Sequence, residues 1–508
     1  MILGDPRDTA IAATPGARAT LDDLFRRAAQ RHPDMLALAD PPNRLDFADG
    51  APRRLTYAQA DRMISAIAER LHGIGLPADS IIGIQLPNTV DYVLALLGVL
   101  RAGMIAAPLP LLWRRSELVA ALVPVDAKAL ITCCRAGGTD LAAVAMQAAA
   151  DMFQIRHVCA FGTDIPDGVM PLDDLYDRDN PEPPRLDEAR AGNRAAHLAM
   201  LTWETTAESV VPVARSHAEL IAGGLAVMLE GGFDNDAVFL SALPPSSFAG
   251  LSVAMLPWLI TGGTLMLHHA FDPETLAQQL QERCDAVILP APVVPRLREA
   301  GFFAGNLRSV IGVWRAPERM NNAPAWPEQS AACIDVACFG EAGVIAARRA
   351  ASGKTMPLPL GIVTAPRDAP GAVPVTKTAQ SGKRTLVLSG PMVPRHAFPP
   401  GVEETGLPFF RTADGIVDTG YPCRADQDAR SLTLTGPPAG IAGVGGYRFG
   451  LRDLQSLAGA FDPECRIAAL PDSFSGHRLI GAADSKAGLR DALIRHGINP
   501  LVAEAFGA

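Results

Sequence analysis

The sequence contains no CxxC pair, and its eight cysteines are scattered without histidines at zinc-ligand spacing. The N-terminus also lacks the unbroken apolar segment of a signal peptide, because Asp5, Arg7 and Asp8 interrupt it. We therefore expect a cytoplasmic protein with reduced cysteines and no metal site. The cysteines are Cys133, Cys134, Cys159, Cys284, Cys333, Cys338, Cys423 and Cys465.

Positive charge is scarce, since the formal net charge is -9. A surface of this charge is not built to neutralise a phosphate backbone, so we expect no nucleic-acid partner. Residues 237–267 carry no charge and are long enough to suggest a membrane span, but Pro244, Pro245, Pro257 and the pair Gly262-Gly263 interrupt them. We predict two buried strands and a helix there, and no membrane span.

The composition indicates a folded protein of more than one domain. Hydrophobic residues make up 48% and charged residues 19% of the 508 residues, and glycine and proline stay below the level of low-complexity chains. At about 150 residues per domain, two to four domains are expected. The chain is thus long enough to bury a sizeable core.

Helical and extended patterns alternate in the first part of the chain. Thr56 and Gln59 form a predicted capping box, and apolar residues at helical spacing follow to Gly73. A short apolar run at 80–87 comes next, then a second helix beginning at Asn88, then another apolar run. Nearly continuous apolar strands between helices are typical of a parallel sheet covered on both faces. The fold class is α/β.

Proline and glycine mark the boundaries along the chain. Residues 177–193 are polar and proline-rich and are predicted to form a surface connection, and residues 346–384 look less regular. The Pro-Pro pair in TGPPAG, residues 435–440, separates a small final α/β pattern from the rest. We predict a large domain over 1–437 and a small domain over 438–508.

Several segments in order carry a family resemblance. RLTYAQADRMISAIAERLHGIGLPADSIIGIQLPNTVDYVLALLGVLRAGMIAAPL, residues 54–109, resembles the opening of the adenylate-forming superfamily, which includes acyl-CoA synthetases and peptide-synthetase adenylation domains. The segments LRSVIGVWRAPE, CFGEAGV and GGYRFGLRDLQ follow in family order. The resemblance implies a large N-terminal domain of stacked mixed sheets with helices, and a small C-terminal α+β domain. It also implies activation of a carboxylic acid with ATP and Mg, and transfer to a thiol such as CoA.

The expected phosphate loop departs from the family pattern TSGTTGxPKG. This chain has LTWETTAESVVPVARSH at 201–217, and the loop lysine becomes Val211 or Val210, depending on the register. No glycine remains to let backbone N–H groups close on phosphate. Either a modified loop still contacts a ligand, or the loop has lost ATP. The positions that the resemblance assigns to it are Thr202, Glu204, Thr205 and Thr206.

The other nucleotide positions are also changed. The family's aromatic-Gly-x-Thr-Glu motif becomes Phe339-Gly340-Glu341-Ala342-Gly343, which keeps the adenine-packing aromatic and loses the magnesium glutamate. The ribose aspartate becomes Tyr421, with Asp418 three residues earlier, and the hinge aspartate becomes Gly440. The C-terminal catalytic lysine has no counterpart, because Lys383 and Lys486, the last two of five lysines, lack its context.

Other segments keep features of the family although the nucleotide positions are changed. Gly445, Gly446 and Tyr447 match the family segment near the pantetheine channel, although the same residues could be a structural turn before a helix that begins near Leu451. Trp258, Trp314, Gly312 and Phe339 suggest an apolar pocket. The pair His268-His269 has no carboxylate partner at ligand spacing and is predicted to lie on the surface.

Three hypotheses follow from this pattern. The first is an acyl-CoA synthetase-like ligase that uses ATP through altered contacts. The second is a catalytically degenerate relative that binds an acyl group, an acyl-CoA or a partner protein without adenylation. The third is a structural subunit of a complex. The partner is accordingly a small carboxylic acid or acyl-CoA, and the sequence is compatible with a homodimer or a protein partner.

Overall fold

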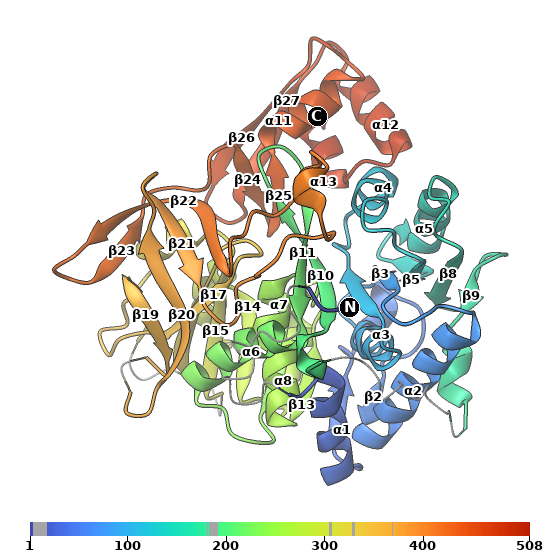
Figure 1. Ribbon diagram of the computed structural model, residues 1–508, viewed down its shortest axis with the longest axis horizontal. Helices are drawn as coiled ribbons and strands as arrows, with labels where there is room; N and C mark the ends of the chain where they lie inside the picture. Colours follow the sequence, from blue (N-terminus) through green and yellow to red (C-terminus); the bar gives the residue numbers. More distant parts are fainter. Residues whose placement is uncertain are drawn as a thin grey trace.

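The computed structural model describes residues 1–3, 18–179, 181, 192–303, 307–327, 331–367 and 369–507. These residues form three large sheets, a four-stranded sheet and a two-stranded ribbon, with helices packed between and around them (Figure 1). Most of the predicted surface connection at 177–193 lies outside the described residues. The mixed α/β class predicted from the sequence is confirmed.

Two sheets built mainly from parallel strands dominate the large domain, as the buried apolar runs predicted. In sheet order, the eight-stranded sheet contains β17 (Val344–Arg348), β16 (Ala332–Cys338), β15 (Ser309–Trp314), β14 (Ala286–Pro290), β12 (Val238–Ser241), β13 (Thr264–Leu267), β1 (Leu36–Ala39) and β2 (Arg54–Thr56). The seven-stranded sheet contains β11 (Val210–Ser216), β10 (Leu198–Thr205), β4 (Ile105–Pro108), β3 (Ile81–Ile84), β5 (Ala129–Cys133), β8 (His157–Phe161) and β9 (Met170–Pro171).

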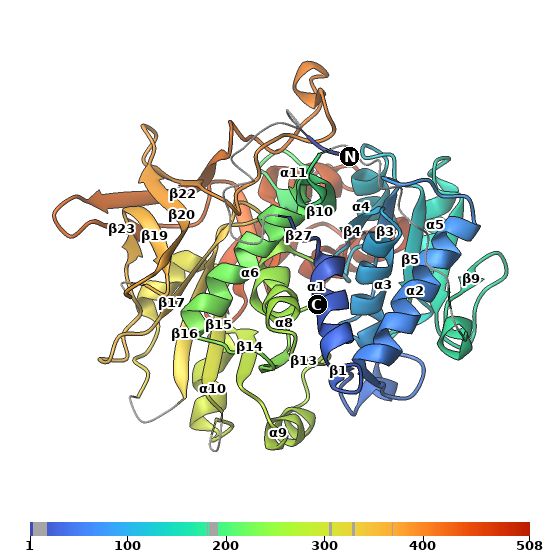
Figure 2. The ribbon, with the colours of Figure 1, turned by 60° about the horizontal axis from the view of Figure 1, so that its bottom comes forward.

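Helices separate these two sheets. Figure 2 shows α6 (His217–Gly231), α8 (Leu256–Thr261), α1 (Leu21–Arg31), α3 (Val90–Arg101) and α2 (Tyr57–Gly73) side by side. The capping box of Thr56 and Gln59 is confirmed at the start of α2. The second predicted helix is α3, and it begins after Asn88 because Thr89 still has extended backbone angles.

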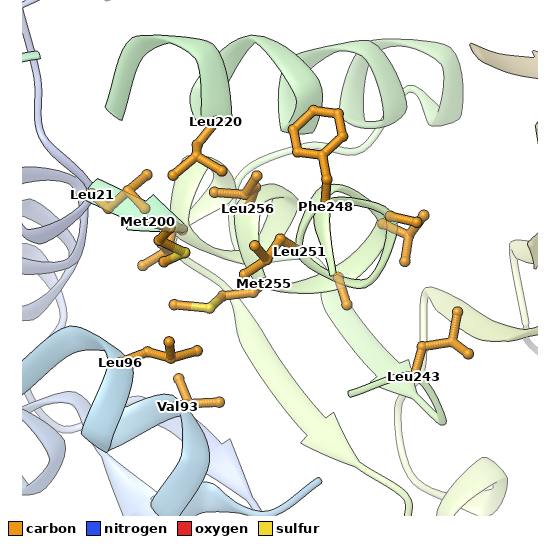
Figure 3. Close-up of a cluster of buried hydrophobic side chains, with 14 of the residues drawn as sticks. Leu21, Val93, Leu96, Met200, Leu220, Leu243, Phe248, Leu251, Met255 and Leu256 are labelled. Atoms are coloured by element: carbon orange, nitrogen blue, oxygen red, sulfur yellow. The ribbon is translucent and has the colours of Figure 1, made fainter. Parts of the chain in front are cut away.

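The uncharged segment 237–267 folds as predicted into β12, short helical turns with α8, and β13. In the described part of the chain no helix is both long enough and apolar enough to cross a membrane. Side chains from α1, α3, α6, α8 and β10 instead meet in one core, where Leu96, Leu220, Phe248 and Met255 are fully or almost fully buried (Figure 3). Burial of apolar side chains at about 25 cal/mol per Å² is the main stabilising contribution of such a core.

The segment predicted to be irregular, residues 346–384, contains regular strands, so that prediction was wrong. These strands join a six-stranded sheet whose partners come later in the chain, as in the pairing of Leu358 with Leu432. Local sequence cannot show such pairing. In sheet order the sheet contains β18 (Leu358–Pro359), β23 (Ser431–Leu434), β22 (Ile416–Asp426), β21 (Thr385–Ser389), β20 (Val373–Gln380) and β19 (Gly361–Ala365).

The last part of the chain has its own sheet and its own core. A separate cluster of buried apolar side chains within residues 442–506 supports our proposal of a domain boundary at 437/438. The helix predicted near Leu451 is confirmed as α11. The elements are β25 (Tyr447–Gly450), β24 (Ile441–Val444), β27 (Gly476–Ala482), β26 (Arg466–Asp472), α11 (Leu451–Gly459), α12 (Lys486–His496) and α13 (Pro500–Ala503).

This C-terminal unit contacts the large domain at several points. The backbone N–H of Ser116, on α4 (Arg115–Leu122), donates to the carbonyl of Gly497 at 3.0 Å. The backbone N–H of Asn499 donates to the Glu117 carboxylate at 2.8 Å. Strand β25 contacts the end of β10, where the Thr205 hydroxyl donates to the Arg448 carbonyl, and both units line a common cavity.

Candidate functional site

The segment expected to be a phosphate loop is a β-hairpin. Strands β10 and β11 pair along their whole length, from Leu198 opposite Ser216 to Thr205 opposite Val210. The Thr206 hydroxyl and backbone N–H both donate to the Ser209 carbonyl at 2.9 Å, which closes the turn. A glycine-rich loop would leave backbone N–H groups open to phosphate, whereas this hairpin uses them in its ladder.

The three threonines of the hairpin therefore have protein partners. The Thr202 hydroxyl accepts a hydrogen bond from Arg215 at 3.2 Å, and the Thr205 hydroxyl donates to the carbonyl of Arg448 at 3.2 Å. Val211 is buried, and Val210 packs against an apolar cluster. In neither alignment does the position of the family's lysine, Val210 or Val211, face an open site.

The Glu204 carboxylate lies where the hairpin meets the C-terminal unit. It accepts hydrogen bonds from the backbone N–H of Glu341 at 2.6 Å and of Thr205 at 2.9 Å, and it forms an ion pair with Arg448. Burial raises the pKa of the Glu204 carboxyl, while Arg448 and both N–H groups act against that rise. Three donors on one carboxylate form a site for a single negative charge, and a side chain occupies it.

Gly340 makes this arrangement possible. Its φ angle is +58°, which L-residues with a side chain rarely adopt. A Cβ atom at this position would lie 1.9 Å from Glu204 Oε2 and 2.2 Å from Arg448 Nη1. The glycine that the family resemblance identified therefore gives room to the ion pair.

Arg448 comes from the C-terminal unit, on β25. Burial disfavours its charge, yet the nearby Glu204 carboxylate raises the pKa of Arg448. The neighbouring Tyr447 hydroxyl accepts a hydrogen bond from the backbone N–H of Leu112 at 3.3 Å, and burial raises the pKa of Tyr447. These contacts hold the β24–β25 hairpin against the large domain.

A second buried pair lies beside the first. Arg215 donates to the Glu341 carbonyl, its Nη1 lies 3.7 Å from Glu341 Oε2, and its guanidinium lies 3.8 Å from the Phe248 ring centroid. Burial lowers the pKa of Arg215 to about 10. The Glu341 carboxylate also accepts from the Phe248 backbone N–H at 2.9 Å, so it is engaged within the protein.

The positions predicted to bind ribose and to form the hinge make contacts with other parts of the protein. Asp418 is exposed and accepts hydrogen bonds from the Thr385 hydroxyl at 2.8 Å and the Gly420 N–H at 3.0 Å. Tyr421 is buried and packs edge-to-face on Phe339, with ring centroids 5.6 Å apart. Gly440 has a φ of +76° and adjoins Ala207. Of these positions, none lines either of the two large cavities described next.

Two cavities meet at the β24–β25 hairpin. The first has a volume of about 330 Å³ and the second of about 450 Å³, and Gly445, Gly446, Tyr447 and Arg448 line both. Volumes of this order suit a small ligand. The sequence-predicted residues that line the first cavity are Glu204, Thr205, Gly340, Glu341, Gly445, Gly446 and Tyr447.

Sequence reasoning missed two arginines of the site, Arg215 and Arg315. Arg315, after β15, lines both cavities, and its Nη2 donates to the Ser247 hydroxyl at 3.0 Å. Arg215 could have been noticed as a charge within the apolar strand pattern VVPVARS. Arg315 gave no such signal, because only the fold brings it to the hairpin.

Only some of the residues that were expected to line an apolar pocket do so. Trp314 lines the second cavity, but Trp258 is fully buried in the core and stacks on Tyr57 at 6.3 Å. The predicted surface position of His268 was wrong, because it is buried and its Nδ1 lies 2.8 Å from Gln279 Oε1 of α9 (Pro273–Gln281). His269 lines the first cavity, where burial lowers its pKa to about 4.

ATP and magnesium do not fit the groups that this site presents. Beside the hairpin, the Glu341 and Thr205 N–H groups and the Arg448 guanidinium already hold Glu204. At the expected magnesium position, a Cβ on Gly343 would lie 3.3 Å from Leu388 Cδ1, so a carboxylate there would enter apolar surroundings. Within the described ranges no three His, Cys, Asp or Glu side chains are grouped to hold a metal. Lys383 and Lys486 are exposed.

Comparisons with known proteins identify relatives of this chain. A 2-hydroxy-7-methoxy-5-methyl-1-naphthoate–CoA ligase of Streptomyces carzinostaticus is 26% identical over 480 residues, covering 91% of this chain and 83% of the relative. A salicyl-AMP ligase/salicyl-S-ArCP synthetase of Mycobacterium tuberculosis is 35% identical over 144 residues, covering 28% of this chain and 24% of its own.

Solved structures share the fold. The amide bond synthetase McbA from Marinactinospora thermotolerans superposes with a TM-score of 0.68 at 18% identity, covering 94% of each chain. MbtA from Mycobacterium smegmatis gives 0.64 at 21% identity, covering 95% of this chain and 90% of that one. The model of the AMP-binding enzyme family matches residues 25–323. The chain therefore belongs to the AMP-binding enzyme family, within the adenylate-forming superfamily.

Proposed function

We propose that this chain binds a small acyl or aryl acid, or its CoA thioester, at the two cavities without activating the acid through ATP. The observation that carries the proposal is the Glu204 carboxylate, held by the Glu341 and Thr205 N–H groups and by Arg448. In this arrangement a protein carboxylate takes the donors that a phosphate oxygen would need.

The energetic argument concerns charge. A polyphosphate at this position would have to displace Glu204 from Arg448 and leave a carboxylate beside further negative charge. Breaking a buried ion pair by removing one partner costs about 3 to 5 kcal/mol. The glycines and the lysine that normally contact phosphate are absent from the hairpin, and Arg215, Arg448 and Arg315 lie near it. The first two of these already face Glu341 and Glu204.

The alternative is an ATP-dependent ligase that forms an acyl-adenylate and passes the acyl group to CoA or a carrier thiol. Family membership and the naphthoate–CoA ligase relative favour it. It requires that Glu204 leave its donors when nucleotide binds. The two functions therefore differ in one measurable property, which is the affinity for nucleotide.

Calorimetric titration with Mg-ATP, and separately with AMP, tests the proposal without a guess about the acid. We expect no binding into the millimolar range, and no pyrophosphate exchange with short, aryl or long acids. Micromolar binding of Mg-ATP, or exchange that depends on one acid, would establish the ligase instead.

A pair of variants locates the cause. Glu204→Gln removes the negative charge and should raise the affinity for inorganic pyrophosphate by about tenfold, which corresponds to about 1.4 kcal/mol. Glu208→Gln is the matched control, because Glu208 is exposed in the turn of the same hairpin and lines neither cavity. Equal pyrophosphate affinity in wild type and Glu204→Gln would show that this carboxylate is not what excludes the anion.

A further inference from the structure

The charged groups that line the second cavity are all positive. Arg315, Arg319 and Arg448 line it, and among the described residues no aspartate or glutamate does. Arg448 pairs with Glu204, and Arg319 donates to the backbone carbonyl of Asp472 at 2.6 Å. Among the described residues, no carboxylate lies within ion-pair distance of Arg315. Of the two arginines that line both cavities, Arg448 thus has a counter-charge and Arg315 has none among the described residues.

The contacts of Arg315 leave part of its guanidinium open. Its Nη2 donates to the Ser247 hydroxyl at 3.0 Å and its Nη1 to the Gly446 carbonyl at 3.4 Å, and both acceptors are neutral. A guanidinium has five N–H donors in a planar fork that matches the two oxygens of a carboxylate. A half-buried arginine with neutral partners at a cavity wall is suited to bind an anion.

Two tryptophans and several leucines give the first cavity an apolar lining. Trp113 and Trp203 line it with ring centroids 5.8 Å apart, and the Trp203 Nε1 donates to the Pro108 carbonyl at 3.0 Å, which fixes that ring. Leu86, Leu109, Leu111 and Leu243 also line this cavity. Aromatic side chains favour stacked or edge-on contact with a planar ligand.

We propose that Arg315 binds the carboxylate of a flat apolar acid whose body lies against the Trp113–Trp203 pair in the first cavity. This inference rests on the proposed function, because it assigns the ligand class of the same cavities. A ligand that carries a phosphate would satisfy the same guanidinium, and inorganic phosphate serves as the competing probe.

The test compares 1-naphthoate with its neutral isostere 1-naphthamide by calorimetry in the absence of nucleotide. Wild type should bind the acid at least about tenfold more tightly than the amide. Arg315→Met keeps an apolar stem beside Gly446, and it should remove this preference while changing amide affinity less than about twofold. Arg315→Lys should restore part of the preference, because it restores the charge. Trp203→Leu should weaken both ligands equally.

Arg452→Met is the matched control, since Arg452 is exposed on α11 and lines neither cavity. The assignment is overturned if the amide binds as well as the acid, if Arg315→Met binds the acid like wild type, or if neither acid nor amide binds. Tighter binding of inorganic phosphate than of 1-naphthoate would also overturn it. Binding of 1-naphthoyl-CoA without the free acid would overturn this assignment alone, whereas Mg-ATP binding would overturn the proposed function.

Discussion

Two buried clusters of arginine and carboxylate groups differ in how they are built. In the first, Arg44 and Arg53 both pair with Asp91, and Arg44 also pairs with Asp40 at 2.6 Å. The Tyr176 hydroxyl donates to Asp91 at 2.7 Å, and the Val90 N–H donates to Asp40 at 2.8 Å. All of these residues belong to the large domain, where they join the start of α3 to the loop after β1.

The second cluster joins the large domain to the C-terminal unit. Glu204 and Arg448 are 244 residues apart, and they lie on β10 and on β25 of the C-terminal sheet. A cluster enclosed in one core contributes to its stability. A cluster at an interface also occupies volume and donors that a ligand could use. Under our proposal, the pair of Glu204 and Arg448 therefore excludes phosphate from this position.

The largest expected effect comes from the enclosed cluster. Asp91→Asn removes the carboxylate that Arg44 and Arg53 share, and it leaves Arg44 with Asp40 and Arg53 with Asp173 as their remaining partners. Because a buried ion pair is broken on both arginines, we expect a loss of about 3 to 5 kcal/mol in the free energy of unfolding. Urea denaturation measures it. The control is Asp234→Asn, because the Asp234 side chain is 83% exposed, and it should change stability by less than about 0.5 kcal/mol. Equal urea midpoints for Asp91→Asn and Asp234→Asn would contradict the prediction that the enclosed cluster stabilises the fold.

The interface pair should show a smaller, coupled effect. In a double-mutant cycle with Glu204→Gln and Arg448→Met, each single change leaves one partner unpaired, and the double change removes both. We expect a coupling energy of about 1 to 3 kcal/mol by urea denaturation. Each single variant should also make the segment around Gly440, which precedes the C-terminal sheet, more sensitive to limited proteolysis. Additive free energies would mean that the pair does not hold the two units together.

The first cavity, which His269 lines, should disfavour a positive charge on this side chain. Its pKa is lowered to about 4 in the fold against 6.5 in the unfolded chain, so between these values only the unfolded chain binds the proton. The contribution of this histidine to the free energy of unfolding is therefore fully present above pH 6.5, and it is lost progressively as the pH falls towards 4. From pH 7.5 to pH 5.5, the wild type should therefore lose about 1 kcal/mol more of its free energy of unfolding than the His269→Gln variant. Parallel pH profiles of the two unfolding energies would contradict this prediction.

The smallest effect is expected at Lys486. This lysine is exposed at the start of α12 and lines neither cavity. Lys486→Ala should change the unfolding free energy by less than about 0.5 kcal/mol and leave 1-naphthoate affinity unchanged. A loss of binding in the same calorimetric assay would show that this residue reaches the ligand, in contrast to the arginines of the interface.

The sequence by itself determined the fold class and several local elements. The capping box of Thr56 and Gln59, the strand-helix-strand alternation after it, and the helix beginning at Leu451 are all present. These features depend on neighbours three or four residues away, or on apolar periodicity, and both are visible in the letters. The changed residues at 201–217 and 339–343 were visible in the same way.

Only the tertiary structure decided what those changes build. That Glu204 takes the Glu341 N–H, that Gly340 gives room to Arg448, and that Arg315 stands between two cavities are contacts between segments far apart in the chain. The burial of His268 depends on α9 in the same way. The reason is physical: a local pattern fixes which face of an element is apolar, but which charges meet across an interface depends on how the elements pack.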